Sequence, residues 1–400
     1  MTHPSVLILG VYHQTLAVMR SLHRAGYTVI LGRGPSRCPE QFSTACDDTW
    51  IHPSPADPRF GPALRSYLND HPETQFIFPI GEEDALAVST VEQLGTQNVA
   101  IAAVEPDLLR ACRDKSSANA VAARAGLAVP QSAVVRSVEE LSETARAIGF
   151  PVIVKPLTSK LPVLGRKAML LTSPAEFESA FIQWPQQHRE LLIQAYIDGP
   201  LEACDYVAQD GRVIGYFEAA SVRTDIPDGT GYAVDFLSKP ISPDVLAACR
   251  KFCATTGYNG PGLLQFIRSK RDGRLYFVEN NPRLSAGIAQ PVICGQDLPL
   301  LALRVAAARR SGESIPDFEA RDSYQTGVRT HWLYRDLQGI LNHRAELTRA
   351  QVLSRFRELV TSCKQADNHM VWQWRDPWPS AVLYGRILAR LLRGAFRRAT

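Results

Sequence analysis

The amino-acid sequence carries a group of oxygen-bearing side chains near two apolar runs. Gln265 lies in the first run, and Glu279 and Asn281 end the second run, just before a Pro-Arg pair. Carboxylate and amide oxygens are hard ligands that suit Mg²⁺, provided that the site leaves positions for water and phosphate oxygens. The first chemical hypothesis is therefore a magnesium site at Gln265, Glu279 and Asn281. The alternative is a surface hairpin with a polar rim.

The length of the loop between the two runs decides whether these side chains can meet. The runs flank Arg271-Asp272-Gly273, a sequence typical of a β-hairpin turn. A two-residue turn at 272–273 would place Gln265 opposite Asn280 and leave Glu279 on the other face. A three-residue loop at 271–273, with its glycine in the left-handed conformation, would place Gln265 opposite Glu279. Only the second pairing gathers the three oxygen ligands on one face of the hairpin.

Residues 275–283, Leu-Tyr-Phe-Val-Glu-Asn-Asn-Pro-Arg, resemble the magnesium-binding hairpin of ATP-grasp enzymes. The set of Gln265, Glu279 and Asn281 is most similar to that of carbamoyl phosphate synthetase. The resemblance implies that these residues hold Mg²⁺ or Mn²⁺. It also implies that Arg283 contacts the transferred phosphoryl group or an acyl phosphate, for which a bidentate guanidinium is well suited. The alternative for Arg283 is a structural ion pair with a carboxylate.

Two lysines precede the hairpin in the order that the family requires. Lys115 stands before an alanine-rich helical segment and resembles the family's first phosphate-binding lysine. Lys155 ends the run Phe150-Pro-Val-Ile-Val-Lys155-Pro and resembles the second. Two ammonium groups on separate elements can neutralise a polyphosphate from both sides. Taken alone, Lys155 could also be an ordinary solvated end of a strand.

The segment Gln194-Ala195-Tyr196-Ile197 resembles the linker between the two subdomains that grasp the nucleotide. The resemblance implies that the backbone of Ala195 and Ile197 meets the adenine edge. Family members usually have Glu at the position of Ala195, but a backbone contact tolerates that exchange. Glu202 follows at a distance suitable for a ribose hydroxyl, and a solvent-facing glutamate is the alternative.

Residues 157–167 should form the glycine-rich flap over the phosphates, yet this stretch contains a single glycine, Gly165. Lys160, Arg166 or Lys167 could supply side-chain cations where the usual flap supplies backbone N–H groups. This departure leaves the flap contacts open.

Two further loops are expected to contact the substrate. They are residues 81–84, at an edge of the expected N-terminal sheet, and residues 223–232, which are rich in Gly, Pro, Asp and Thr. Arg223 is a candidate anchor for a substrate carboxylate, and the alternative is a solvated loop arginine. Tyr12 and His13 follow a glycine turn and could also face a substrate, although an ordinary tight turn is favoured there.

The pattern of apolar runs predicts an α/β and α+β fold class. Residues 1–105 alternate short strands and helices, which predicts an open parallel sheet. By the resemblance this sheet is the pre-ATP-grasp domain, and residues 106–310 form the two-subdomain ATP-grasp fold with a hinge near 194–199. Residues 311–400 are expected to form a mainly helical C-terminal extension. No GxGxxG follows the first strand, so a dinucleotide-binding role has little support.

Composition excludes several other classes of protein. The chain has 400 residues, 45% of them hydrophobic. Its formal charge of +4 is too small to indicate a nucleic-acid-binding surface. Its eight cysteines show neither a CxxC pair nor zinc-finger spacing, so they are expected to be reduced thiols of a cytoplasmic protein. No apolar run reaches the length of a membrane span, and the first run is too short for a signal peptide.

The C-terminal residues from 378 onward interleave arginine with leucine and isoleucine. Such a basic amphipathic helix could lie on an anionic membrane surface or against a partner. The favoured alternative is a terminal helix docked on its own domain. A homodimer is expected only because members of the family that the chain resembles often form dimers.

The reaction that the resemblance implies is the ATP-dependent activation of a small-molecule carboxylate. The carboxylate would become an acyl phosphate, and an amine or similar nucleophile would displace phosphate, with release of ADP and phosphate. The alternatives are a carboxyphosphate-forming or kinase-like enzyme, and a nucleotide-binding regulatory protein without turnover.

Overall fold

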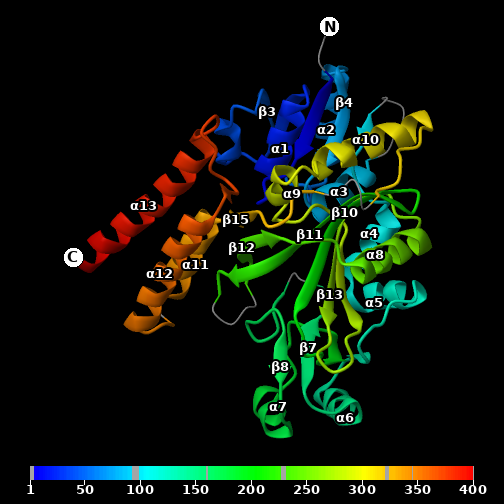
Figure 1. Cartoon of the computed structure of the whole chain (residues 1–400), viewed down its shortest axis with the longest axis vertical. Coiled ribbons are helices and arrows are strands. Elements are labelled where there is room, and N and C mark those ends of the chain that lie inside the picture. Colours follow the sequence, from blue (N-terminus) through cyan, green and yellow to red (C-terminus); the bar gives the residue numbers. More distant parts are fainter. Residues whose placement is uncertain are drawn as a thin grey trace.

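The computed structural model describes residues 4–91, 99–158, 161–226, 231–319, 324–344 and 346–399, with side chains described up to residue 390. Three sheets follow one another from top to bottom in Figure 1, and a group of C-terminal helices lies to one side. The arrangement is the mixed α/β and α+β architecture that the sequence predicts.

The N-terminal sheet is parallel and has the strand order β3-β2-β1-β4-β5. Its central strand, β1, is buried at every position, because helices cover both faces of the sheet. The strands are β1 (Ser5–Leu9), β2 (Thr28–Arg33), β3 (Asp48–Ile51), β4 (Thr74–Pro79) and β5 (Ala100–Ile101). The helices are α1 (Thr15–Arg24), the 3-10 helix η1 (Glu40–Phe42), α2 (Phe60–Asp70) and α3 (Glu82–Ser89).

A smaller antiparallel sheet with the order β6-β9-β7-β8 follows in the chain. Helices α6 and α7 pack on it around an apolar core of its own. The strands are β6 (Ser132–Val135), β7 (Val152–Pro156), β8 (Met169–Leu171) and β9 (Leu191–Ala195). The helices of this part are α4 (Pro106–Arg113), α5 (Lys115–Arg124), α6 (Val138–Ile148) and α7 (Pro174–Ala180).

The largest sheet has the order β14-β13-β10-β11-β12-β15-β16. One core joins it to α5 and α8, and another joins it through α9 and α10 to the parallel sheet. The strands are β10 (Leu201–Gln209), β11 (Arg212–Thr224), β12 (Ala233–Ser238), β13 (Gly260–Arg268), β14 (Leu275–Asn281), β15 (Arg329–His331) and β16 (Asn368–His369). The helices are α8 (Pro243–Thr256), α9 (Ala289–Ile293) and α10 (Leu298–Ser311).

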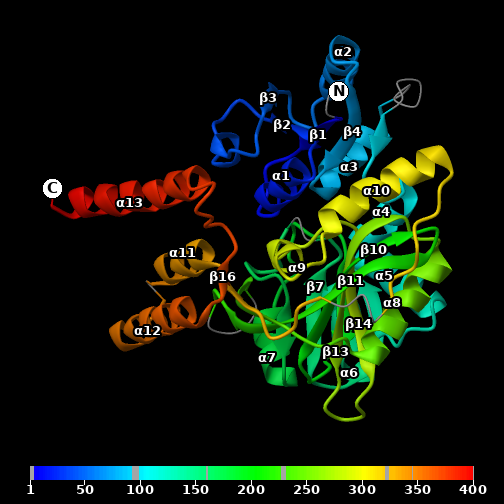
Figure 2. The ribbon, with the colours of Figure 1, turned by 45° about the horizontal axis from the view of Figure 1, so that its top comes forward.

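The C-terminal segment contains the helices α11 (Leu333–His343), α12 (Arg349–Gln365) and α13 (Trp378–Ala399). Figure 2 shows that these helices extend away from the three sheets. The segment was expected to be mainly helical, but it also adds β15 and β16 to the edge of the largest sheet. A buried ion pair between Arg20 Nε and Asp376 Oδ2, 2.8 Å apart, ties the start of α13 to α1.

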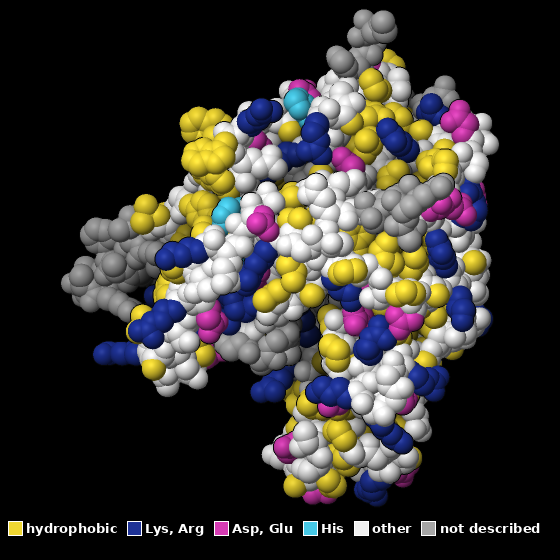
Figure 3. Space-filling model, viewed as in Figure 1, with side chains coloured by type: hydrophobic (Ala, Val, Ile, Leu, Met, Phe, Trp, Pro, Cys, Tyr) yellow, Lys and Arg dark blue, Asp and Glu magenta, His cyan; other side chains and the backbone are white. Residues whose placement is uncertain are grey.

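The described part of α13 docks on its own molecule. Ile387 is buried, and Arg386 donates a hydrogen bond to the carbonyl of Arg37 at 2.8 Å. Contact of this helix with a membrane surface stays a prediction. On the face drawn in Figure 3, basic side chains are scattered among acidic ones rather than gathered in one patch. Among the described residues, no helix is both long and apolar enough to cross a membrane.

Candidate functional site

The hairpin of β13 and β14 pairs Gln265 with Glu279, as predicted. The turn that connects the strands differs from both alternatives. Ser269 donates its N–H to the carbonyl of Arg274 at 2.9 Å, so a four-residue loop closes the hairpin. Gly273 has a φ of +71° and occupies the left-handed position expected for it. This turn alone would put Gln265 one residue out of register with Glu279.

A β-bulge at Val278 restores the pairing. Phe266 pairs with Phe277, and the next pair is Gln265 with Glu279, so Val278 is the extra residue of β14. The bulge also shifts the alternation of the side chains. Phe277 and Asn280 are both buried in the core, although three positions separate them.

Glu279 and Asn281 consequently face away from the core, on the side of a cavity. The Nδ2 atom of Asn281 donates to Oε1 of Glu279 at 2.8 Å. Asn280, between them, accepts a hydrogen bond from the buried Tyr206 hydroxyl at 2.9 Å and fixes the strand. The structure thus brings two of the three predicted ligand residues into direct contact, and places Gln265 opposite Glu279 on the neighbouring strand.

The cavity has a volume of about 590 Å³ and lies between the parallel sheet, α4, α5 and the hairpin. Carboxyl ends of parallel strands are the usual ligand-binding edge of such sheets, and the turn after β1 contributes to the wall. The lining residues that the argument below uses are Tyr12, His13, Glu82, Lys115, Tyr232, Glu279, Asn281 and Arg283.

Lys115 and Lys155 lie within electrostatic range of each other and of Glu279. The backbone N–H of Lys115 donates to the carbonyl of Leu157 at 3.0 Å, which holds the start of α5 against the end of β7. Burial, reinforced by the charge of Lys115, lowers the pKa of Lys155 to about 8. Burial also lowers the pKa of Lys115, and Glu279 opposes that shift. Lys155 is therefore no solvated strand end, because only 8% of it is exposed.

Arg283 sits between the hairpin and the parallel sheet. Its Nη2 atom donates to Oδ1 of Asn281 at 3.3 Å, and its Nε atom is 3.6 Å from Oε1 of Glu82. Arg113 approaches the same carboxylate at 3.3 Å. Burial raises the pKa of Glu82, and Arg283 and Arg113 oppose the shift. The guanidinium of Arg283 thus combines a structural pair with a position on the cavity wall.

The linker residues run beside Lys155. Ala195 pairs with Val152, three residues before Lys155 on β7, a distance of about 10 Å along a strand. The N–H of Ala195 donates to the carbonyl of Gln131 at 2.8 Å, and that of Tyr196 to the carbonyl of Pro151 at 3.2 Å. An adenine contact would therefore use the carbonyl of Ala195 and the N–H of Ile197. Gln194 is buried.

Glu202 is not solvent-facing. It pairs with Lys239, and its Oε1 atom is 3.1 Å from Nε of Arg268. Lys239 also lies 3.2 Å from the buried carboxylate of Glu218. A contact between Glu202 and ribose would have to share these ion pairs, so its predicted role stays open.

The expected role of Arg223 as a carboxylate anchor is wrong. Residues up to Thr224 belong to β11 rather than to a loop, and the side chain of Arg223 is only 14% exposed. Its guanidinium donates to both carboxylate oxygens of Asp336, on α11, and to Ser362 Oγ at 3.2 Å. The sequence interval of more than a hundred residues between Arg223 and Asp336 concealed this pairing.

Aromatic side chains form the far wall of the cavity. Tyr12 and His13, for which a tight turn was favoured, both line it, and the ring of His13 lies 5.5 Å from that of Tyr232 and 4.9 Å from that of Trp332. Burial, with the charge of Arg335, lowers the pKa of His13, so its imidazole is neutral. Nothing in the sequence indicated that residues 12–13 and Tyr232 would lie side by side on one wall.

Gly10 explains why Tyr12 faces the cavity. Its φ is +100°, and an added Cβ would lie 2.5 Å from Oδ2 of Asp84. The chain therefore turns closely over α3, where Asp84 accepts the N–H of Gly81 at 3.0 Å. Burial raises the pKa of Asp84 to about 6. Residues 81–84 therefore lie beside the cavity, but they form the N-cap and first turn of α3 rather than the expected loop.

The flap residues are described in part, since Lys160 lies outside the described residues. Val163 and Arg166 exchange two backbone hydrogen bonds around a turn in which Leu164 and Gly165 both have positive φ. The Nζ atom of Lys167 lies 4.9 Å from the centre of the Tyr232 ring. The flap thus reaches the aromatic wall of the cavity through a cation–π contact.

Comparisons with known proteins find two family models that match parts of the chain. A RimK-like ATP-grasp domain matches residues 112–221, and the ATP-binding domain of the carbamoyl-phosphate synthase L chain matches residues 234–313. The first match contains Lys115 and Lys155, and the second contains the β13–β14 hairpin. Both models describe ATP-binding domains of the ATP-grasp type, so this part of the chain is similar to an ATP-grasp domain. ATP-grasp enzymes of this group are ADP-forming ligases.

Individual relatives are similar at low identity. The carbamoyl phosphate synthase large chain of Clostridium perfringens is 26% identical over 301 residues, which cover 65% of this chain and 27% of that protein. The chain therefore spans about a quarter of the length of this curated relative. Among solved structures, N5-carboxyaminoimidazole synthetase of Staphylococcus aureus has a TM-score of 0.63 at 15% identity, covering 86% of this chain and 87% of that one. Biotin carboxylase of Campylobacter jejuni, in complex with an ATP analogue, has a TM-score of 0.62 at 19% identity, covering 82% and 74%. Such likeness supports the ATP-grasp fold.

Proposed function

We propose that this ATP-grasp chain is a ligase that uses ATP to activate a small-molecule carboxylate as an acyl phosphate and joins it to an amine or similar nucleophile. The observation that carries the proposal is the convergence of Glu279 and Asn281 with Lys115 and Arg283 on one cavity. An oxygen-ligand pair beside two cations is the arrangement that phosphoryl transfer needs, because charge on the phosphate oxygens must be neutralised from several sides.

The donor set of the hairpin fits a divalent cation of the Mg²⁺ type. Glu279, Asn281 and Gln265 offer oxygen atoms from two adjacent strands, and the first two already touch each other. A bound Mg²⁺ or Mn²⁺ would neutralise charge on the phosphates of ATP. The backbone of Ala195 and Ile197 would hold adenine, with Gln194 and Tyr196 supporting the linker and Glu202 near the ribose. Lys115, on the wall of the cavity, and Lys155, buried close to it, would hold the phosphates.

Arg283 would bind the acceptor carboxylate and then the acyl phosphate. Its contact with Asn281 puts the guanidinium next to the metal-binding side chains, where the new phosphate would form. The carboxylate oxygen would attack the γ-phosphorus, ADP would leave, and a nucleophilic amine would then displace phosphate at the carbonyl carbon. The aromatic wall of Tyr12, His13 and Tyr232 would hold the organic part of the acceptor.

The domain limits, location and assembly belong to the same proposal. We assign residues 1–105 to the pre-ATP-grasp domain, 106–310 to the ATP-grasp domain with its hinge near 194–199, and 311–400 to the C-terminal extension. The eight described cysteines are free, four of them fully enclosed in the cores, which supports a cytoplasmic enzyme. Homodimerisation is proposed from the family alone.

ADP release from the purified chain, measured across a panel of carboxylates with and without amines, tests the proposal. The expected result is ADP formation that requires both a carboxylate and an amine and is lost in Glu279→Gln. ADP release with a carboxylate alone or with bicarbonate would support a kinase-like or carboxyphosphate-forming enzyme instead. ATP binding without any ADP across the panel would support a regulatory protein.

A further inference from the structure

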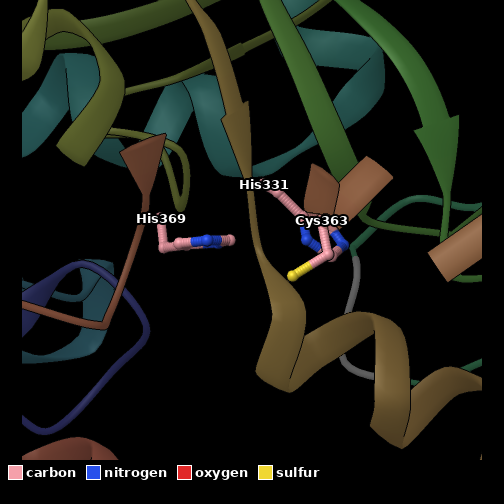
Figure 4. A group of neighbouring side chains, drawn as sticks. All are labelled: His331, Cys363 and His369. Atoms are coloured by element: carbon pink, nitrogen blue, oxygen red, sulfur yellow. The ribbon is translucent and has the colours of Figure 1, made fainter. Parts of the chain in front are cut away.

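A second group of metal-ligating side chains lies away from the nucleotide cavity. His331 on β15, His369 on β16 and Cys363 near the end of α12 offer ligand atoms that all lie within 4.8 Å of one another. Figure 4 shows the three side chains converging from these three elements. The two histidines are direct partners in the parallel pairing of β15 with β16. Neither the ATP-grasp fold nor the proposed ligase reaction accounts for this cluster.

The hydrogen bonds of His331 determine which of its nitrogens can bind an ion. The ring is fully buried, and its Nε2 atom lies 2.9 Å from Oδ2 of Asp336. Both carboxylate oxygens of Asp336 also accept hydrogen bonds from the guanidinium of Arg223, so they act as acceptors toward His331. Nε2 must then carry the proton, so Nδ1 carries the lone pair. A histidine oriented by a carboxylate is the usual form of a metal-binding imidazole.

Two ring nitrogens of the cluster lack a hydrogen-bond partner. Among the described residues, Nδ1 of His331 and Nδ1 of His369 are both buried without one. Leaving a buried polar atom unpaired is unfavourable. A cation shared with the thiolate of Cys363 would satisfy both nitrogens at once.

The carboxylates around the cluster are paired with arginines. Asp336 is paired with Arg223, and Asp235 is held by two hydrogen bonds from Arg329 at 2.8 and 2.6 Å. Ser362, the neighbour of Cys363, donates to Asp235 at 2.7 Å and fixes the end of α12. Each of the two buried carboxylates is thus paired with a guanidinium.

We propose that His331, Cys363 and His369 bind a zinc ion with three protein ligands and leave the fourth position to water. Two imidazoles and one thiolate form a soft donor set that favours Zn²⁺ over Mg²⁺. Tetrahedral coordination would bring the ligand atoms to roughly 3.3–3.6 Å from one another. The cluster needs only a small contraction from its present spacing.

Such an ion would join three elements of the C-terminal segment. It would clamp α12 and β16 to β15, next to Trp332, whose ring contacts His13 on the wall of the nucleotide cavity. The expected role is to stabilise that wall, since the cluster does not line the cavity.

Cobalt substitution tests the proposal on the full chain. The chelator-treated chain is titrated with Co²⁺, and the expected result is one equivalent bound with thiolate-to-cobalt charge-transfer absorption that Zn²⁺ removes by displacement. Cys363→Ser should abolish this absorption, and Cys46→Ser, at another half-buried free cysteine, should retain it. Glu279→Gln should also retain it, because the hairpin offers only oxygen ligands.

A second measurement does not depend on any variant remaining folded. X-ray absorption on the zinc-loaded wild-type chain should show one sulfur and two imidazole nitrogens around the ion. His369→Gln, at the sheet edge, should weaken zinc binding at least tenfold with an unchanged circular dichroism spectrum. Absence of the charge-transfer band in the wild type, its persistence in Cys363→Ser, or a coordination shell without sulfur would each overturn the proposal.

Discussion

Two regions of the molecule gather potential metal ligands, and they do so in different ways. In the β13–β14 hairpin, Glu279 and Asn281 are two residues apart in one strand and face an open cavity. In the C-terminal segment, His331, Cys363 and His369 come from three elements and lie among buried ion pairs. The first set offers hard oxygen atoms, and the second offers nitrogen and sulfur.

The type of ligand atom and its accessibility suit the two regions to different ions. Oxygen ligands at an accessible wall suit Mg²⁺ that arrives and leaves with a nucleotide, because Mg²⁺ retains water and phosphate ligands. Nitrogen and sulfur ligands that are buried or half-buried suit an ion that stays and stabilises the fold. We therefore expect substitutions in the hairpin to abolish ADP formation with little change in the free energy of unfolding. Substitutions around the C-terminal cluster should lower the free energy of unfolding.

The largest expected effect is that of Glu279→Gln on ADP formation. Loss of this carboxylate should reduce the rate by about 10³-fold, since it removes charge stabilisation at the phosphates. The midpoint of thermal unfolding should change little. Glu143→Gln, at an exposed position on α6, is the matched control and should leave both quantities unchanged. A Glu279→Gln chain with near-normal turnover would remove the hairpin from the active site.

Arg223→Ala tests the opposite half of the comparison. The substitution leaves Asp336 buried without its guanidinium, so the free energy of unfolding in urea should fall by about 3 kcal/mol. Arg136→Ala breaks an exposed pair with Glu190 and should cost less than about 1 kcal/mol. Equal losses in the two variants would mean that the Arg223 pair does not stabilise the C-terminal segment.

The pH dependence of ATP affinity should report Lys155. With a pKa of about 8 the ammonium loses its proton as the pH rises through that value, so affinity for ATP should weaken severalfold between pH 7 and pH 9.5. Titration calorimetry across this range measures the effect. Lys155→Arg keeps its charge and should show a flatter profile. A wild-type profile as flat as that of the arginine variant would exclude Lys155 from the phosphate contacts.

The smallest expected effect is that of Glu202→Gln on nucleotide affinity. If the carboxylate shares its ion pairs with a ribose hydroxyl, loss of one hydrogen bond of about 1 kcal/mol should weaken ATP binding about fivefold. Asp107→Asn, in the exposed pair with Arg110, is the control. An unchanged dissociation constant in Glu202→Gln would make that residue purely structural.

Much of the nucleotide site could be predicted because its signals are local. Apolar runs and turn residues predict the order in which the two lysines and the hairpin follow one another along the chain. They also predict the Gln265–Glu279 pairing and the left-handed conformation of Gly273. The bulge at Val278 could not be predicted, since it depends on how Phe277 and Asn280 pack into the core. The predicted pairing of Gln265 with Glu279 was therefore confirmed, although the predicted length of the turn was wrong.

Sequence alone determined which side chains are available for the proposed chemistry: the oxygen-bearing Gln265, Glu279 and Asn281, the two lysines, and the family that they resemble. Tertiary structure alone decided which distant side chains meet, as with Arg223 and Asp336, or the histidines and the cysteine of the C-terminal segment. The physical reason is that turns and side-chain alternation act over a few residues, whereas buried ion pairs and ligand clusters exist only when packing removes their partners from water.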